Sequence, residues 1–272
     1  MIEGNLRKMA VSLAEPVRYQ LCLDEERLEL NPYLGQRIHL QHTGEIFCVA
    51  CGRKTKKSFS QGYCYPCTQK LAQCDICIVR PEKCHFAAGT CREPDWAQQH
   101  CFIPHYVYLA NSSGLKVGIT RGSQIPTRWI DQGATQALPI FRASSRFKVG
   151  MLEELLKKQV ADKTDWRKML KGDALALDLP ACRDRIFEQS GMEIDALLAQ
   201  FPGEIEPLRA EAVTTITYPV NEYPHKVSSL DFDKTAEVSG VLQGIKGQYL
   251  MLDTGVINLR KFGGYRLRFG TE

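Results

Sequence analysis

The sequence predicts an α+β protein made of several small units, one of them held together by metal. Nine of the eleven cysteines lie between Cys48 and Cys101. Short alternating segments typical of strands occur near both ends, and a hairpin–helix–strand–helix order occupies the middle. We expect N-terminal strands (residues 1–47), a cysteine-rich region (48–104), a hairpin and helix domain (105–171), a helical connector (172–206) and a β-rich domain (207–272).

The N-terminal region has the pattern of short strands. Residues 17–23 and 37–42 alternate between apolar and polar side chains, and turn signals stand at Asn31-Pro32 and Thr43-Gly44. Residues 45–47 then lead into the first cysteine turn.

Two Cys-x2-Cys pairs predict a four-cysteine zinc site. Cys48 and Cys51 form the first pair, and Cys64 and Cys67 form the second. Two thiolates on one tight turn occupy two corners of a tetrahedral ion, so two such turns complete the site. The stretch between the pairs has the length of a hairpin arm, as in a zinc ribbon.

The remaining cysteines predict a second zinc ion. We expect Cys74 and Cys77 to supply two ligands, and the sequence does not choose the other two among Cys84, Cys91 and Cys101. His85 and His100 are alternative ligands or neighbours of the site. An iron–sulfur cluster would also accept such thiolates, especially around residues 74–84.

A disulfide framework is the competing interpretation. Such frameworks are typical of short secreted chains, whereas this one has 272 residues and starts without the apolar core of a signal peptide. No stretch approaches the ~18 apolar residues of a membrane helix. We therefore expect a cytoplasmic protein with reduced thiols and no membrane association.

Charge is unevenly distributed along the chain. Between Cys48 and Ile130 there are eleven Lys and Arg against four acids, whereas residues 151–272 have sixteen against nineteen. Zinc-bound thiolates offset part of the first excess. The cations of residues 53–57, beside Phe59, Tyr63 and Tyr65, suit phosphate contact and base stacking, or form a solvated arm.

The middle of the chain predicts two strands, a helix, a third strand and a second helix. Residues 105–110 and 115–120 form a hairpin around a turn at Asn111–Gly114, a helix begins at Thr127, and residues 139–147 form the next strand. The following helix is amphipathic. Its apolar face consists of Leu152, Leu155, Leu156 and Val160.

This order, with Tyr106-Val-Tyr108, Lys116-Val-Gly118 and Arg128, resembles the GIY-YIG nuclease domain, particularly its diverged phage-type branch. Those domains have an aromatic-rich first strand, a second strand ending in glycine, an arginine in the next helix and a glutamate in a later one. The resemblance covers roughly residues 105–170. The whole chain also looks like a bacterial family known only as a domain of unknown function.

The resemblance implies phosphodiester hydrolysis by Tyr108, Lys116, Arg128 and Glu153. Glu153, or Glu154 in its place, would hold one Mg²⁺. Arg128 would grip the scissile phosphate, and a tyrosine would orient or deprotonate water if cations lowered its pKa. This chain departs from the pattern at Lys116, which replaces the second signature tyrosine. It departs again at Gln132, which cannot shuttle a proton.

The C-terminal region has the pattern of several short strands, which predicts a small barrel. We expect the N-terminal strands to complete it, because neither end has enough strands to bury its own apolar face. It contains cations and aromatic residues that would suit single-stranded nucleic acid. They are Lys246, Arg260, Lys261, Arg266, Arg268, Tyr249, Phe262 and Tyr265.

The sequence thus favours a zinc-containing protein that binds DNA or RNA, with metal-dependent endonuclease activity as one hypothesis and binding without catalysis as another. A protein-interaction adaptor with structural zinc is the third interpretation.

Overall fold

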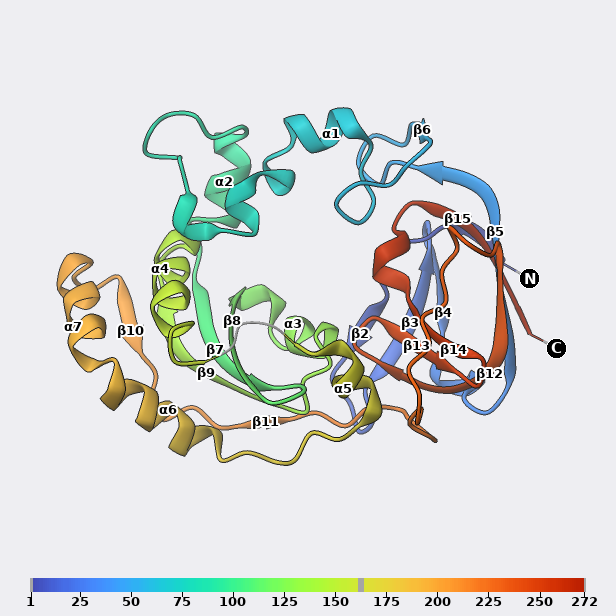
Figure 1. The fold of residues 1–272 in the computed structure, drawn as a ribbon. Coiled ribbons are helices and arrows are strands. Elements are labelled where there is room, and N and C mark those ends of the chain that lie inside the picture. The colour runs from blue at the N-terminus through green and yellow to red at the C-terminus, as the bar shows by residue number, and fades with distance from the viewer. Residues whose placement is uncertain (1, 161–163, 272) are drawn as a thin grey trace.

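Antiparallel sheets organise the computed structural model, which describes residues 2–160 and 164–271. The strands form a seven-stranded, a five-stranded and a three-stranded sheet. Figure 1 shows two lobes side by side, with a segment that contains α1 (Tyr65–Lys70) and α2 (Pro94–His100) crossing from one to the other. The mixed α and β class expected from the sequence is confirmed.

Strands from both chain ends form the first lobe. The seven-stranded sheet has the order β1-β15-β5-β12-β13-β14, with β6 paired to β5, and the three-stranded sheet has the order β2-β3-β4. Leu21 and Leu23 of the small sheet share one buried core with Leu267 of the large one. The strands are β1 (Ile2–Asn5), β2 (Ala10–Ser12), β3 (Arg18–Leu23), β4 (Glu26–Glu29), β5 (Arg37–Phe47), β6 (Lys54–Thr55), β12 (Glu237–Lys246), β13 (Tyr249–Leu252), β14 (Gly255–Asn258) and β15 (Tyr265–Thr271).

The two chain ends are joined in this lobe by strand pairing. Ile2 lies opposite Phe269, and β5 lies between β15 and β12. Each end would otherwise expose the hydrogen-bonding edge of a short strand group. We expected a small barrel-like domain that the N-terminal strands complete, and among the described residues strands from both ends do pair in one sheet, in an open order.

The second lobe is built on a five-stranded sheet with β7 in the middle. Its order is β10-β9-β7-β8, and β11 also pairs with β9. The strands are β7 (His105–Asn111), β8 (Leu115–Arg121), β9 (Gln136–Ala143), β10 (Ile205–Pro207) and β11 (Thr214–Thr215). The expected connector therefore includes a strand at residues 205–207.

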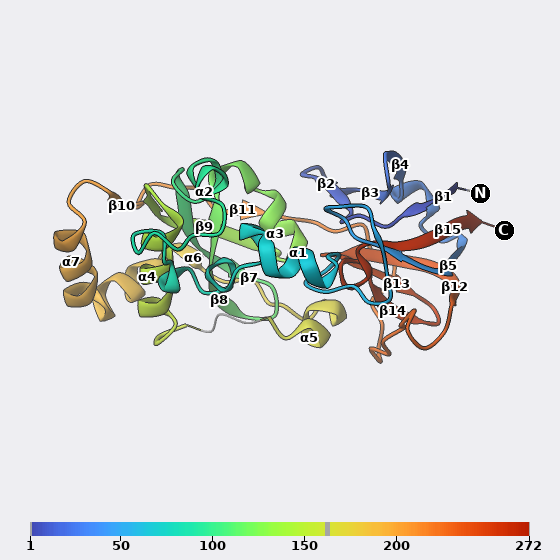
Figure 2. The ribbon, with the colours of Figure 1, turned by 90° about the horizontal axis from the view of Figure 1, so that it is seen from above.

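Alternate side chains of β7 enter different cores, as the two-residue period of a strand requires. Val107 and Leu109 pack with α4 (Arg146–Leu156), α6 (Leu179–Gln189) and α7 (Gly191–Gln200). Tyr108 and Ala110 face the other way, towards α3 (Thr127–Asp131) and the core of the first lobe. Figure 2 shows α3 on the side of the second lobe that faces the first lobe. Tyr108 therefore packs in a core to which both lobes contribute.

The cysteine-rich segment has little apolar core of its own. In residues 48–104, all of which the structure describes, no Val, Leu, Ile, Phe, Tyr or Trp is fully buried. Besides α1 and α2 it contains the short 3₁₀ helices η2 (Ala72–Cys74), η3 (Ile76–Ile78) and η4 (Pro81–Lys83). A segment of this kind needs another source of stability, and metal is the usual one.

The remaining helices connect these parts. They are α5 (Trp166–Lys171), η1 (Asn31–Tyr33), η5 (Gly122–Gln124) and η6 (Leu259–Phe262). Within the described part of the chain, every helix is too short or too polar to cross a bilayer.

Candidate functional site

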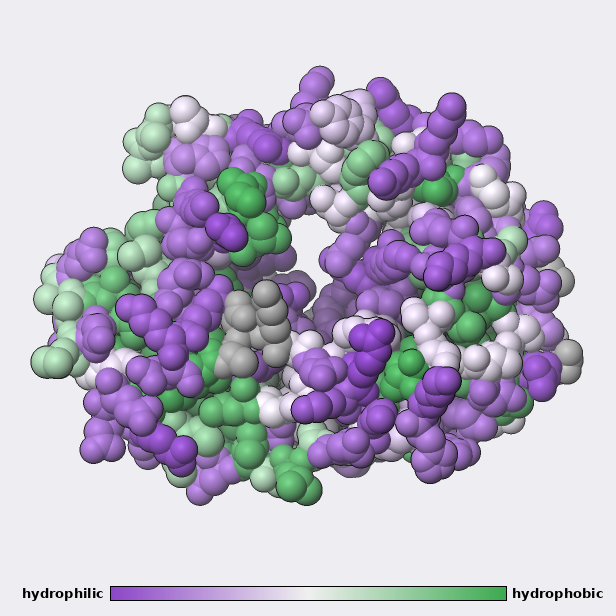
Figure 3. Space-filling model, viewed as in Figure 1, coloured by the Kyte–Doolittle hydropathy of each residue, from purple (hydrophilic) through white to green (hydrophobic). Residues whose placement is uncertain are grey.

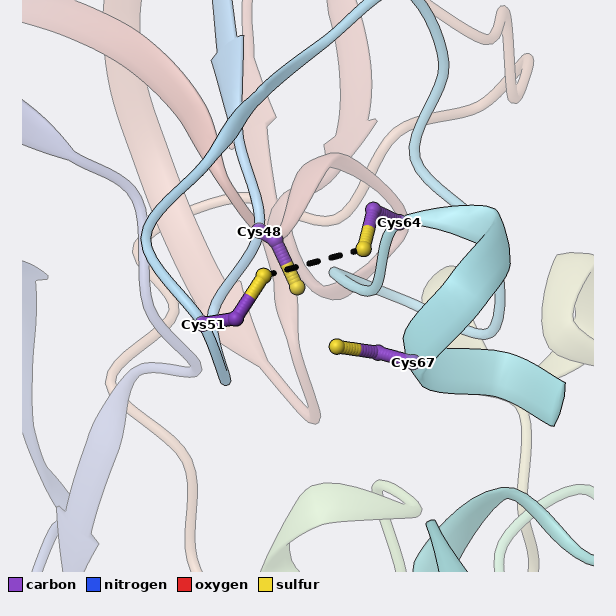
Figure 4. A group of neighbouring side chains, drawn as sticks. All are labelled: Cys48, Cys51, Cys64 and Cys67. Carbon is purple, nitrogen blue, oxygen red and sulfur yellow. Dashed lines mark hydrogen bonds between the residues drawn. The ribbon is translucent and has the colours of Figure 1, made fainter. Parts of the chain in front are cut away.

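The first four cysteines converge at the junction of β5 and α1. Cys48 follows the end of β5, Cys51 lies on the next turn, Cys64 caps the start of α1 and Cys67 lies in its first turn. The four sulfur atoms all lie within 4.8 Å of one another (Figure 4), and the Sγ atoms of Cys51 and Cys64 are 3.7 Å apart. Thiolates bound about 2.3 Å from one tetrahedral zinc ion lie about 3.8 Å apart. This set is a candidate metal site consistent with zinc.

The second pair lies at the start of a helix, and the stretch between the pairs, which we expected to form a hairpin arm as in a zinc ribbon, is mostly irregular. Only Lys54–Thr55 continues the sheet, as β6, and the chain then turns through Gly62 into α1. The turn passes close to its neighbours, because a Cβ at Gly62 would lie 2.6 Å from the side chain of Val49. The backbone at Gly62, with φ of 141°, also favours glycine.

The pKa values of two of these thiols, Cys48 and Cys67, are shifted in opposite directions. Burial raises the pKa of Cys48, but hydrogen bonds from the backbone of Cys51, Cys64 and Ala50 outweigh it and lower this pKa to about 6. Burial, together with hydrogen bonds to the other three thiols, raises the pKa of Cys67. Four thiolates at this spacing repel one another, so a divalent cation is needed to ionise the whole set.

The other cysteines of the segment divide into two groups. Cys77, Cys84, Cys91 and Cys101 line one cavity together with Trp96 and other apolar residues. Cys74, which we expected to supply a second metal ion together with Cys77, does not line this cavity. Asp75 between them is extended and separates η2 from η3, so the two cysteines lie on different turns.

Both histidines have other partners in this region. His85 Nε2 lies 3.4 Å from Asp75 Oδ2, and His85 Nδ1 lies 2.8 Å from the Thr90 hydroxyl. Asp75, Cys77 and His85 also have ligand atoms within 4.8 Å of one another. His100 stacks on Trp96 with ring centroids 4.1 Å apart.

The residues implied by the nuclease resemblance are brought together beside β7. The Tyr108 hydroxyl donates a hydrogen bond of 2.9 Å to Gln132 Oε1, and Lys116 Nζ donates to the same oxygen and, over 2.9 Å, to Thr164 Oγ1. Tyr108 and Lys116 are almost completely buried. Gly118 lies under the tyrosine ring, since a Cβ there would come within 2.7 Å of the Tyr108 hydroxyl.

Arg128 and Glu153 both interact electrostatically with Tyr108. Burial raises the pKa of Tyr108, Arg128 lowers it by charge and by a hydrogen bond, and Glu153 raises it. Arg128 is solvent-exposed, whereas the Glu153 side chain is 14% exposed and lies 3.8 Å from Lys157. Glu154 pairs with Lys157 at 2.7 Å and is more exposed. The tyrosine is therefore neutral near pH 7, which argues against its acting as a base.

A cleft of about 350 Å³ opens from these residues towards the first lobe. It is lined by Lys116, Arg128 and Gln132 on one side and by Gln61, Tyr249 and Arg260 on the other. Figure 3 shows the surface deeply hollowed between the lobes, with mostly hydrophilic residues around the opening. Sequence reasoning identified Tyr249 and Arg260 only as part of a C-terminal patch.

Two further features of the cleft escaped sequence reasoning. Trp166, at the start of α5, stacks on Tyr249 with an interplanar angle of 4° and ring centroids 5.8 Å apart. Burial lowers the pKa of Arg260. The negative charge of Asp131 raises this pKa, and the positive charge of Arg128 lowers it further. Only the meeting of the two lobes brings these residues together.

The expected C-terminal patch of cations is dispersed in the structure. Arg266 and Arg268 each pair with Glu3 at 2.6 Å, and Lys261 pairs with Asp231 at 2.6 Å. Lys246 is buried between the rings of Tyr218 and Tyr223. Of this group, only Arg260 lines the cleft.

The fold and the first thiol set define a mixed α/β protein with a four-cysteine candidate metal site. Residues 35–267 match the family model described as "Protein of unknown function (DUF2797)". The match covers most of the chain, so the chain belongs to this family. No curated protein and no solved structure matches it. These comparisons supply no support for the likeness to GIY-YIG nucleases.

Proposed function

We propose that this protein binds single-stranded nucleic acid in the cleft between its lobes and carries zinc at Cys48, Cys51, Cys64 and Cys67. The observation that carries the proposal is the lining of the cleft. It combines Arg128, Lys116 and Arg260 with the stacked rings of Trp166 and Tyr249. Cations that contact phosphates and flat aromatic faces that stack on bases are the usual components of such binding sites.

The charges in the cleft support an anionic ligand. Arg128 and Arg260 are close enough for the charge of one to lower the pKa of the other. The acid of the cleft, Asp131, is engaged, since it pairs with Lys8 and accepts a hydrogen bond of 2.8 Å from Gln248. A phosphate between the arginines would relieve their repulsion and use the planar donors of both.

The zinc-bound turn stabilises one wall of this cleft. Gln61, close to the first thiol set in the chain, accepts a hydrogen bond of 2.7 Å from Arg260 Nε. Exposed cations at Arg53, Lys56 and Lys57 extend the basic surface on the same segment. The role of zinc in this proposal is to hold the segment that positions Gln61, and so Arg260.

The test is binding of fluorescent single-stranded DNA and RNA oligonucleotides, measured by anisotropy over a range of salt concentrations. We expect Arg128→Ala and Arg260→Ala each to weaken binding about tenfold and to reduce the slope of log affinity against log salt by about one. Arg185→Ala is the matched control, because Arg185 is exposed on α6, outside the cleft. Binding that is equally strong in all three variants would refute the proposal.

A second candidate function is Mg²⁺-dependent cleavage of the bound strand. The approach of Arg128 and Glu153 to Tyr108 favours it, because it matches the arrangement that the nuclease resemblance implies. Glu153 would hold the ion, which would stabilise the leaving oxygen, and Arg128 would hold the phosphate. The neutral Tyr108 hydroxyl donates a hydrogen bond to Gln132 Oε1, so water would have to be deprotonated by another group.

Cleavage assays with and without Mg²⁺ separate binding from catalysis. Glu153→Gln should abolish cleavage without weakening oligonucleotide binding, and Glu154→Gln should leave both intact. Binding without cleavage in the natural protein would eliminate the nuclease. The absence of both would leave the interpretation as a protein-interaction adaptor with structural zinc.

A further inference from the structure

Four cysteines outside the first candidate metal site line a single cavity, and they lie in or next to three short helices. Cys77 lies in η3, Cys84 follows η4, Cys91 precedes α2 and Cys101 follows it. The rest of the lining is largely apolar and includes Ile78, Phe86, Trp96 and Phe102. The four thiols therefore face one largely apolar cavity, and each of these cysteines is partly buried.

The spacing of these thiols differs from that of the first set. Hydrogen bonds connect the thiols of the first set, and all four sulfurs lie within 4.8 Å of one another. The four thiols of the second set influence one another only through charge, and no such close grouping of them occurs in the described part of the chain. They face one cavity but do not form the close set that one zinc ion requires, since its tetrahedral ligands lie about 3.8 Å apart.

A mixed zinc site at Asp75, Cys77 and His85 is the competing arrangement. Asp75 is already paired with Arg92, whose Nε lies 2.7 Å from its Oδ2, and the same carboxylate oxygen faces His85 Nε2. A zinc ion at this place would have to displace both contacts. It would also leave Cys84, Cys91 and Cys101 without a bound metal. The thiols therefore point to a larger centre.

A partly buried cation beside the cavity indicates an anionic centre. Arg146, the first residue of α4, lines the adjoining space with Cys77, Cys84 and Cys101, and its Nη2 donates to the carbonyl oxygen of Ile78. Its Nε is buried and has no hydrogen-bond partner. Burial lowers the pKa of Arg146, while Cys101 and Cys77 raise it. A sulfur-rich anion would accept a hydrogen bond from this N–H and would balance part of the positive charge of the guanidinium.

We propose that Cys77, Cys84, Cys91 and Cys101 hold a [4Fe–4S] cluster. In such a cluster each thiolate binds a separate iron, so the iron and sulfide core separates the sulfur ligands more widely than a single ion does. Each thiol releases its proton on binding iron, and the four thiolates with the oxidised core carry a net negative charge, which Arg146 partly balances. The inference is independent of nucleic-acid binding.

The cluster would also join the cysteine-rich segment to the second lobe. Helix α4 packs against η4 so closely that a Cβ at Gly150 would lie 2.5 Å from that of Pro81. The backbone N–H of Arg146 donates a 2.7 Å hydrogen bond to the carbonyl of Cys101. The same helix carries Glu153.

The experiment is metal analysis of the full chain purified without oxygen, or reconstituted with ferrous iron and sulfide. We expect about four iron and about four acid-labile sulfide per chain, one zinc, a broad absorption near the violet edge of the visible range, and an electron paramagnetic resonance signal after dithionite reduction. Cys84→Ser and Cys101→Ser should lose the iron and the signal but keep the zinc, which shows that the first site is still folded.

Cys74→Ser is the matched control, because Cys74 lies in the same segment but outside the cavity, and it should keep iron, sulfide and zinc. Two zinc ions and no iron in the natural protein, even after reconstitution, would overturn the proposal. A cluster that survives in both Cys84→Ser and Cys101→Ser, or is lost in Cys74→Ser, would overturn the ligand assignment.

Discussion

The cysteine-rich segment and the central sheet reach a fixed structure by opposite means. In residues 48–104 no large apolar side chain is fully buried, and the thiols are the groups that converge. In β7, by contrast, Val107, Tyr108, Leu109 and Ala110 are completely buried in two cores. Removing apolar surface from water holds the sheet together, whereas the cysteine-rich segment has little apolar burial and instead contains a candidate metal site.

Removal of zinc should have the largest effect and should be confined to one region. In small zinc modules, metal binding contributes on the order of 10 kcal/mol to the folded state. We expect Cys67→Ser, or chelation of the natural protein, to abolish hydrogen-exchange protection around Cys48 and α1 while β7 stays protected. Cys182→Ser, on α6, is the control. Equal loss of protection in β7 would show that the two regions are not separately stabilised.

Shortening a side chain in the core of the sheet should have the converse effect, which is to destabilise the sheet while the zinc content stays unchanged. Leu109 is completely buried between β7 and the helices, so Leu109→Ala should lower the free energy of unfolding by about 2–5 kcal/mol. Leu175, which is 84% exposed, is the matched control, and Leu175→Ala should change it by less than about 0.5 kcal/mol. Urea unfolding followed by circular dichroism measures both changes. Zinc content should be unchanged in both variants, and zinc loss in Leu109→Ala alone would contradict the separation.

A buried charge in the apolar region should have the smallest effect. Burial lowers the pKa of Lys246 from 10.5 to about 8, with the rings of Tyr218 and Tyr223 facing the ammonium. Between those two values the unfolded chain binds more protons than the folded one, so stability should rise as pH increases from about 8 to 10.5. Below pH 8 the penalty is constant.

Lys246→Met should remove this dependence. The variant should be more stable than the natural protein at pH 7, by on the order of 1–3 kcal/mol, and the two should converge at higher pH. Melting temperatures between pH 7 and 10.5 measure the difference. If Lys246→Met is less stable at pH 7, contact between the ammonium and the two rings outweighs the cost of desolvation.

The sequence by itself identified the first candidate metal site, because the four ligands come from two short stretches of chain. Cys48 with Cys51 and Cys64 with Cys67 are each close neighbours along the chain, so each pair can occupy two corners of one tetrahedral site. The strand period likewise predicts which side chains of β7 share a face. Tyr108, Gly118 and Arg128, in contrast, were singled out by the resemblance to the GIY-YIG domain.

Only the tertiary structure decided which elements that are far apart in the sequence come into contact. The extended backbone at Asp75 separates Cys74 from Cys77, although the spacing of these two cysteines equals that of the first pairs. The cleft requires Arg128 of α3 to face Arg260, which follows β14, across two lobes. Periodicity and ligand spacing report contacts within a turn or a strand, whereas such long-range contacts follow from how whole sheets and helices pack.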